Sequence, residues 1–199
     1  MRIVALCLGA FLAFSSLVAA RAAEDAPPAE NGPATALPSK ASELKELFKT
    51  LQSTKDEAAA KIAEARILQL WLESGSDTID LLMGWAINAT EEKDYATALN
   101  LLDRITTLKP DYAEGWNKRA TVYFLTDDYA KSISDIRRTL ALEPRHFGAL
   151  SGLGVIMRAL GDKSGAITAF KQALAADPFL SNVKDALGEL EKEAAGRDI

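Results

Sequence analysis

The sequence predicts an all-α fold made of a row of helical hairpins, and three observations support this prediction. Pro110, Pro144 and Pro178 recur at intervals of 34 residues, and a fixed period of about 20–50 residues is typical of repeat architectures. Between the prolines, apolar residues follow the 3.6-residue period of helices. Small, large apolar and acidic residues also recur in the same register: Ala86, Ala120 and Gly154; Ala98, Ser132 and Ala166; Leu102, Ile136 and Phe170; Asp94, Asp128 and Asp162.

The N-terminus predicts a secretory signal peptide over residues 1–22. Arg2 gives a short basic region and an apolar stretch follows it. Ala20-Arg21-Ala22 fits the small-x-small pattern that precedes cleavage, and so does Val18-Ala19-Ala20. An uncleaved anchor is the alternative, because residues 3–20 carry no charge and approach the length of a membrane span. Cys7 is the only cysteine and lies in this segment, so a cleaved chain has no disulfide and no thiolate ligand.

Two segments precede the regular units. Residues 23–40 are predicted to be a disordered tether, because their prolines prevent a continuous helix and few large apolar residues are present to bury. Residues 41–78 predict a helical hairpin whose second helix opens with a capping box at 54–57. Large Phe48 stands where later units have Ala or Gly, so we expect this hairpin to be an atypical first unit that caps the row.

Three regular units follow, each with two helices of about a dozen residues joined by a short polar turn. An aspartate in each turn is suited to cap the second helix, and a proline ends each unit because it cannot continue the helix before it. The units span residues 79–112, 113–146 and 147–180. A capping box at 111–114 opens the middle unit. Residues 181–199 predict a capping helix and tail, because one side of the helix is apolar and the other charged.

The middle unit resembles the tetratricopeptide repeat family. The family pattern is W-x2-L-G-x2-Y, then A-x3-F, then P, over about 34 residues. The resemblance extends over residues 79–180, with Arg119 where the family has Leu and Ser132 where it has Ala. In the middle unit the pattern reads Trp116, Arg119, Ala120, Tyr123, Ser132, Ile136 and Pro144.

The resemblance implies a right-handed superhelix whose concave face, formed by the first helix of each unit, usually binds a peptide or a protein. Some family members hold a carboxylate there with a Lys/Asn/Arg clamp, which is not expected here because the residues at its positions are uncharged. The alternative for Met83, Ile87 and Val155 is internal packing. The residues that the resemblance places on this face include Met83, Ile87, Asn117, Thr121, Phe124, Ser151, Val155 and Arg158.

Composition and motifs argue against several classes of function. The net charge is −5 and no Lys/Arg cluster is present, which is unlike a nucleic-acid-binding surface. His146 is the only histidine, and we interpret it as a surface or junction residue because catalytic triads and histidine metal sites need partners that the chain lacks. Trp85, Trp116, Tyr95 and Tyr129 are expected in the core. The sequence therefore predicts no catalytic residue, metal ion, cofactor or small-molecule substrate.

Together these features predict a non-enzymatic interaction scaffold of the periplasm that binds a partner peptide or protein through its concave face. Contact with a membrane is expected only if the N-terminal segment stays uncleaved. The alternatives are an assembly factor anchored in the inner membrane and a regulatory subunit of an envelope enzyme. A stripe on the second helices, with Lys131, Asp135 and Arg138, is expected to be exposed and to take no part in binding.

Overall fold

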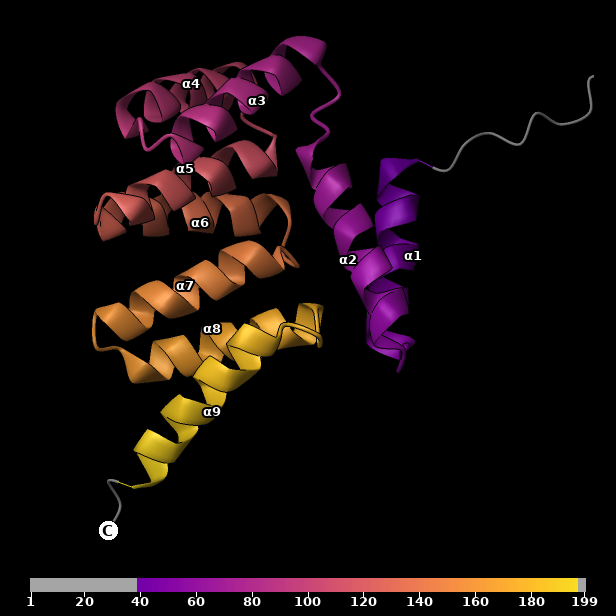
Figure 1. Cartoon of the computed structure of the whole chain (residues 1–199), viewed down its shortest axis with the longest axis vertical. Coiled ribbons are helices and arrows are strands. Elements are labelled where there is room, and N and C mark those ends of the chain that lie inside the picture. Colours follow the sequence, from indigo (N-terminus) through magenta and orange to yellow (C-terminus); the bar gives the residue numbers. More distant parts are fainter. Residues whose placement is uncertain (1–38, 197–199) are drawn as a thin grey trace, which may run out of the picture. The chain divides into compact units, whose positions relative to one another are not determined.

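The computed structural model describes residues 39–196, which form nine helices with short connections (Figure 1). The predicted signal peptide and nearly all of the predicted tether lie outside the described residues. Most helices have 13–16 residues, as the spacing of apolar residues predicts. The helices are α1 (Lys40–Ser53), α2 (Glu57–Leu72), α3 (Asp77–Glu91), α4 (Tyr95–Leu108), α5 (Ala113–Leu125), α6 (Tyr129–Leu142), α7 (Phe147–Ala159), α8 (Lys163–Ala176) and α9 (Ser181–Ala195).

The hairpins α3–α4, α5–α6 and α7–α8 are stacked in chain order, and α9 packs on α8 (Figure 1). This confirms the predicted all-α fold of sequential helical hairpins. Small residues lie where the two helices of a hairpin approach each other: Ala98 and Ala166 are fully buried, and a Cβ at Gly154 would collide with the ring of Phe170. We call these three stacked hairpins the array.

Aspartates begin the second helix of each hairpin in the array, as predicted. Each carboxylate accepts a hydrogen bond from a backbone N–H three residues later, which satisfies a donor that the helix itself leaves unpaired. The oxygen-to-nitrogen distances are 3.1 Å for Asp94 and Thr97, 3.2 Å for Asp128 and Lys131, and 2.9 Å for Asp162 and Gly165.

The two predicted capping boxes are wrong. The hydroxyl of Thr54 accepts from the backbone N–H of Asp56, and Asp56 itself caps α2 by accepting from the N–H of Ala58. At the start of α5 no side chain caps the helix. The carboxylate of Glu114, which a capping box would need, is instead buried and held by His146.

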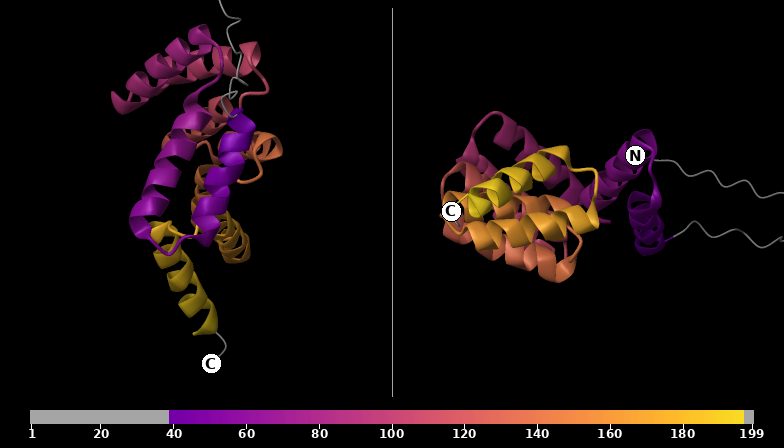
Figure 2. Two further views of the ribbon diagram at one scale, coloured as in Figure 1. Left: turned by 90° about the vertical axis from the view of Figure 1, so that its right-hand side faces the viewer. Right: turned by 90° about the horizontal axis from the view of Figure 1, so that it is seen from below.

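The α1–α2 hairpin does not cap the end of the array, which corrects the expectation for residues 41–78. α1 lies against α8 and α2 lies against α5, so the hairpin runs alongside the junctions between successive repeats (Figures 1 and 2). The reason is the burial of apolar side chains of the hairpin. Phe48, Ile67 and Trp71 share one core with Phe147, at the start of α7, and with Ala176, at the end of α8. Burial of these apolar side chains stabilises this placement.

Aromatic and polar contacts fix the hairpin on the junctions. The indole of Trp71 stacks on the imidazole of His146, with centroids 4.1 Å apart and an interplanar angle of 11°. The phenol of Tyr112 donates a hydrogen bond to the carbonyl oxygen of Leu72 at 2.7 Å. The guanidinium of Arg145 lies 4.1 Å from the ring centroid of Phe48.

One aromatic residue expected in the core is exposed. Trp85 keeps 51% of its surface accessible, because none of the helices α1–α9 packs on the outer side of α3. Tyr95, Trp116 and Tyr129 are half-buried. Met83 was predicted on the exposed binding face, but it is buried. It is 2% exposed and belongs to the core of α3 and α4. The internal-packing alternative therefore holds for Met83, whose side chain is not available on the predicted binding face.

Candidate functional site

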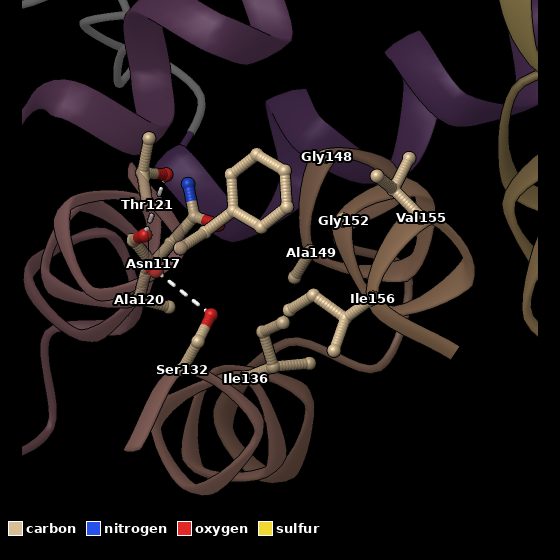
Figure 3. Close-up of a pocket in the computed structure, with 11 residues that line it drawn as sticks. Asn117, Ala120, Thr121, Ser132, Ile136, Gly148, Ala149, Gly152, Val155 and Ile156 are labelled. Atoms are coloured by element: carbon tan, nitrogen blue, oxygen red, sulfur yellow. Dashed lines mark hydrogen bonds between the residues drawn. The ribbon is translucent and has the colours of Figure 1, made fainter. Parts of the chain in front are cut away.

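A hollow of about 170 Å³ lies between α5, α6 and α7, on the side of the array formed by its first helices (Figure 3). We call the side formed by α3, α5 and α7 the first-helix face. The hollow has an apolar floor of Ala120, Ile136 and Ile156, and Phe124 and Val155 form part of its walls. A half-open hollow with an apolar floor can take up one apolar side chain of a ligand.

Two glycines produce this hollow. Gly148 and Gly152 lie four residues apart on α7, on the side that lines it. A Cβ added at Gly152 would have as its nearest neighbour the Cδ1 of Ile136 at 3.9 Å, so a side chain there would enter open space. In the 34-residue register these positions correspond to Glu114 and Lys118 of the middle repeat. Four of the predicted binding residues line this hollow, but Gly152 was not predicted, although its place in the register was the available signal.

Polar groups lie at the rim of the hollow. The amide nitrogen of Asn117 donates to both carboxylate oxygens of Glu114, at 3.2 and 3.3 Å. Among the described residues no group donates to the side-chain oxygen of Asn117, which is therefore available to a ligand N–H. The hydroxyls of Thr121 and Ser132 donate to backbone oxygens of the protein itself, at 3.0 and 2.8 Å (Figure 3).

A second hollow of about 180 Å³ lies between α3, α4 and α5. Ile87 and Thr90 line it from α3, and Lys118 lines it from α5. Thr121 belongs to both hollows, so they are neighbours on the first-helix face. The face therefore offers two apolar recesses, one on each side of α5.

The structure brings five of the eight predicted binding residues to these hollows. Ser151 and Arg158 do not line them: the hydroxyl of Ser151 donates to the carbonyl of Phe147 at 2.7 Å, and Arg158 pairs with Glu189 of α9 at 3.0 Å. Met83 is buried, as described above. The binding role of the remaining residues stays a prediction. They are Ile87, Asn117, Thr121, Phe124 and Val155.

A buried polar cluster lies next to the first-helix face. The Nε2 of His146 is 2.8 Å from a carboxylate oxygen of Glu114, and both side chains are almost fully buried. The Nδ1 of His146 accepts from the backbone N–H of Ala149, so Nε2 carries the proton that is donated to Glu114. Burial by itself raises the pKa of Glu114, but hydrogen bonds from His146 and Lys118 outweigh it and hold that pKa below its usual value.

This cluster joins α2, α5 and α7. His146 is thus a junction residue as predicted, but it is buried and not on the surface. Both ring nitrogens and both oxygens of Glu114 are engaged by protein groups. Within residues 39–196 no three His, Cys, Asp or Glu side chains come together in a way that could hold a metal ion.

The predicted stripe on the second helices is only partly exposed. Lys131 and Arg138 are exposed, but Asp135 is 4% exposed, which corrects the expectation for that residue. Its carboxylate is held by Arg119 through two hydrogen bonds of 2.7 and 2.8 Å. Asp135 therefore belongs to the packing between helices.

The sequence profile of the tetratricopeptide repeat matches residues 126–181. A TPR repeat-containing protein of Rhizobium etli is 42% identical over 153 residues, which covers 77% of this chain and 75% of that protein. Within the described residues, no helix combines the length and the apolar content that a membrane span requires.

Solved structures of tetratricopeptide domains have a similar fold. The first TPR of Spaghetti (RPAP3), bound to an HSP90 peptide, has a TM-score of 0.56 and 20% identity, covering 59% of this chain and 93% of that one. The Yersinia enterocolitica type III secretion chaperone SycD, in complex with a peptide of the translocator YopD, has a TM-score of 0.57 and 13% identity, covering 60% and 96%. At these identities the likeness concerns the fold alone.

Proposed function

This chain belongs to the tetratricopeptide repeat family, and we propose that it is a non-enzymatic scaffold that binds a peptide segment of a partner protein on its first-helix face. Tetratricopeptide domains bind peptides of partner proteins, and two of the similar structures are themselves peptide complexes. The relative from Rhizobium etli supports the same architecture over most of the chain.

The observation that carries this proposal is the apolar hollow between α5 and α7. Its walls of Phe124 and Val155 are suited to an apolar side chain, and the oxygen of Asn117 beside them is suited to a backbone N–H. Few charged residues line the two hollows, and they include Lys118 and Glu91 of the second. The partner segment is therefore recognised by its apolar side chains and its backbone, and not by a terminal carboxylate.

We place this activity in the cell envelope. The pattern of residues 1–22 supports export, because a basic start, an apolar stretch and a small-x-small site occur in that order. Intact-mass spectrometry of the protein isolated from its own cells tests this placement. A mass that corresponds to a chain cleaved after Ala22 or Ala20 supports the periplasmic location. The mass of the uncleaved chain would indicate that the N-terminal segment stays as an anchor.

The binding proposal is tested by affinity capture from envelope extract, followed by mass spectrometry. Gly152→Leu places a large side chain into the hollow, so we expect it to lose partners that the original chain captures while the circular dichroism stays unchanged. Gly188→Leu is the matched control, because Gly188 lies in α9 and a Cβ there would meet no atom within 4 Å. Equal capture by both variants would contradict the assignment of the hollow.

A second pair of variants separates the two sides of the array. Asn117→Ala combined with Phe124→Ala should abolish capture, because it removes the free acceptor and one apolar wall. Lys131→Ala combined with Arg138→Ala changes exposed residues of α6 and should leave capture intact. The reverse outcome would place the partner on the second helices.

A further inference from the structure

No helix within residues 39–196 covers the outer side of α3 and α4, at one end of the array. We call it the end face. Three large apolar side chains are exposed there: Leu81 by 54%, Trp85 by 51% and Leu108 by 65%. The hairpin that was expected to cover this end lies against α5, α7 and α8 instead. In a stack of hairpins, such a face is normally buried by the next unit.

The apolar residues of the end face lie in two rows, one on α3 and one on α4. Leu81 and Trp85 are four residues apart on α3, and Leu101 and Leu108 are seven apart on α4, so each pair lies on one side of its helix. Gly84 lies beside them in the middle of α3, where glycine weakens a helix. A Cβ at Gly84 would meet no atom within 4 Å, so packing within the chain does not require it. A glycine there leaves room for another chain to approach closely.

We propose that two copies of this chain pair through their end faces, with α3 of one copy on α4 of the other. Such pairing is isologous and closes after two copies. Head-to-tail stacking is not available, because α9 covers the opposite end: Val183 and Leu190 are buried there, and α9 carries exposed charged residues such as Asp185 and Lys192.

The charges of the end face are complementary to those of a second copy. α3 contains no Lys or Arg, Asp77 and Glu92 are exposed at its two ends, and the exposed Lys93 follows Glu92 in the turn to α4. Arg104 is exposed on α4 and makes no ion pair among the described residues. When α3 packs on α4 of the other copy, each Arg104 approaches an acidic residue across the interface, whereas pairing α3 with α3 would bring like charges together.

The area of the patch also fits a dimer. Leu81, Trp85 and Leu108 together expose roughly 350 Å² per copy, against about 800 Å² of total surface per partner in a standard interface, of which a little over half is apolar. The apolar part is therefore close to what a moderately stable dimer requires. Polar residues around the patch supply the rest.

Sedimentation equilibrium of the full chain over a wide range of concentrations tests the proposal. We expect a monomer–dimer equilibrium, and Trp85→Glu should weaken it by about tenfold or more, because a charge replaces an apolar contact at the centre of the interface. Leu108→Glu is a second variant with the same expected effect. Ile62→Glu is the matched control, because Ile62 is 72% exposed on α2 and should leave dimerisation unchanged. Circular dichroism confirms that each variant is folded.

Charge reversal tests the arrangement of the helices. Arg104→Glu should weaken the dimer at low salt, and the same change at Arg137, an exposed residue of α6, should not. A chain that stays monomeric at every concentration would overturn the proposal, and would be the result if another segment or a different protein covers the end face. Equal weakening by Trp85→Glu and Ile62→Glu would also overturn it.

Discussion

Arg119 occupies a position where the repeat pattern has leucine, and the structure shows what compensates for the change. Its guanidinium forms two hydrogen bonds with Asp135 of α6, and Nη1 bonds to Asp103 of α4 at 2.8 Å. The guanidinium carbon of Arg119 lies 4.8 Å from the ring centroid of Trp116. Hydrogen bonds to Asp135 hold the pKa of Arg119 above its usual value. One side chain thus connects two neighbouring repeats.

Arg119→Leu restores the residue of the repeat pattern, yet it should destabilise the protein. It leaves the carboxylate of Asp135 buried without a partner, which costs about 3–5 kcal/mol. Urea denaturation followed by circular dichroism measures the change. Arg119→Leu combined with Asp135→Leu should recover most of the lost free energy, because no buried charge remains. A single variant as stable as the original chain would show that the ion pair does not stabilise the fold.

At the scale of elements, the α1–α2 hairpin holds the junctions of the array together. α2 has apolar residues on most of its circumference, and Ile67, Leu70 and Trp71 are its large residues that are buried. The Nε1 of Trp71 has no hydrogen-bond partner among the described residues, so this indole acts through ring contacts with His146 and Phe147. The attachment of the hairpin therefore depends on apolar and stacking contacts more than on hydrogen bonds.

Trp71→Ala should loosen the hairpin selectively. Removal of a buried Trp side chain costs about 3–5 kcal/mol, and this loss falls on the contact between the hairpin and the array. Hydrogen exchange should show lower protection in α1 and α2 than in α5 to α8. Trp71→Phe keeps a ring in the same place and should show a smaller effect. Equal loss of protection in all helices would mean that hairpin and array unfold as one unit.

At the scale of the whole molecule, the capping aspartates couple stability to pH. Hydrogen bonds from Thr97, Lys131 and Gly165 hold the pKa values of Asp94, Asp128 and Asp162 below their usual range. A lowered pKa in the folded state contributes stability above the unfolded pKa of about 3.9, and this is lost as the pH falls through the folded values.

We therefore expect the melting temperature to change little between neutral pH and about pH 5, and to fall below about pH 4. A variant with Asn at the three capping positions keeps a capping oxygen but does not titrate. Its melting temperature should fall less steeply over the same acid range. Parallel curves for the two proteins would contradict the role of these caps.

Asp177 has the opposite effect on the pH dependence of stability. It is fully buried after α8; its Oδ1 accepts from the N–H of Phe179 at 2.9 Å, and its Oδ2 has no hydrogen-bond partner among the described residues. Burial raises the pKa of Asp177, and the hydrogen bond from Phe179 and the charge of Lys184 offset this only in part. A raised folded pKa contributes stability below the unfolded pKa, and this is lost as the pH rises through the folded value.

Asp177→Asn removes this buried charge and keeps an acceptor for the N–H of Phe179. At pH 7 the melting temperature of the variant should be about a few degrees higher than that of the original chain. At pH 4 the two melting temperatures should differ less or not at all. Calorimetry at the two pH values measures the difference. The same difference in melting temperature at both pH values would show that the charge of Asp177 does not destabilise the folded protein.

Local features of the fold could be predicted from the sequence because they depend on contacts between near neighbours in the chain. The 34-residue period, the capping aspartates and the small residues of the register lie within single hairpins or between adjacent ones. The resemblance placed Asn117, Phe124 and Val155 on the first-helix face for the same reason. Once the repeat register shows which residues of a first helix pack on its neighbouring helices, the 3.6-residue period determines which residues lie on its exposed side.

The remaining features arise from contacts that no local pattern specifies. Trp71 meets His146 across a distance of two repeats in the chain, and Glu114 meets His146 from 32 residues away, so only the folded structure shows the hairpin beside the array. This placement leaves Trp85 exposed. The hollow at Gly152 depends on how closely α5 and α7 approach. Periodicity determines which side of a helix is apolar, but tertiary packing decides which apolar surface covers it.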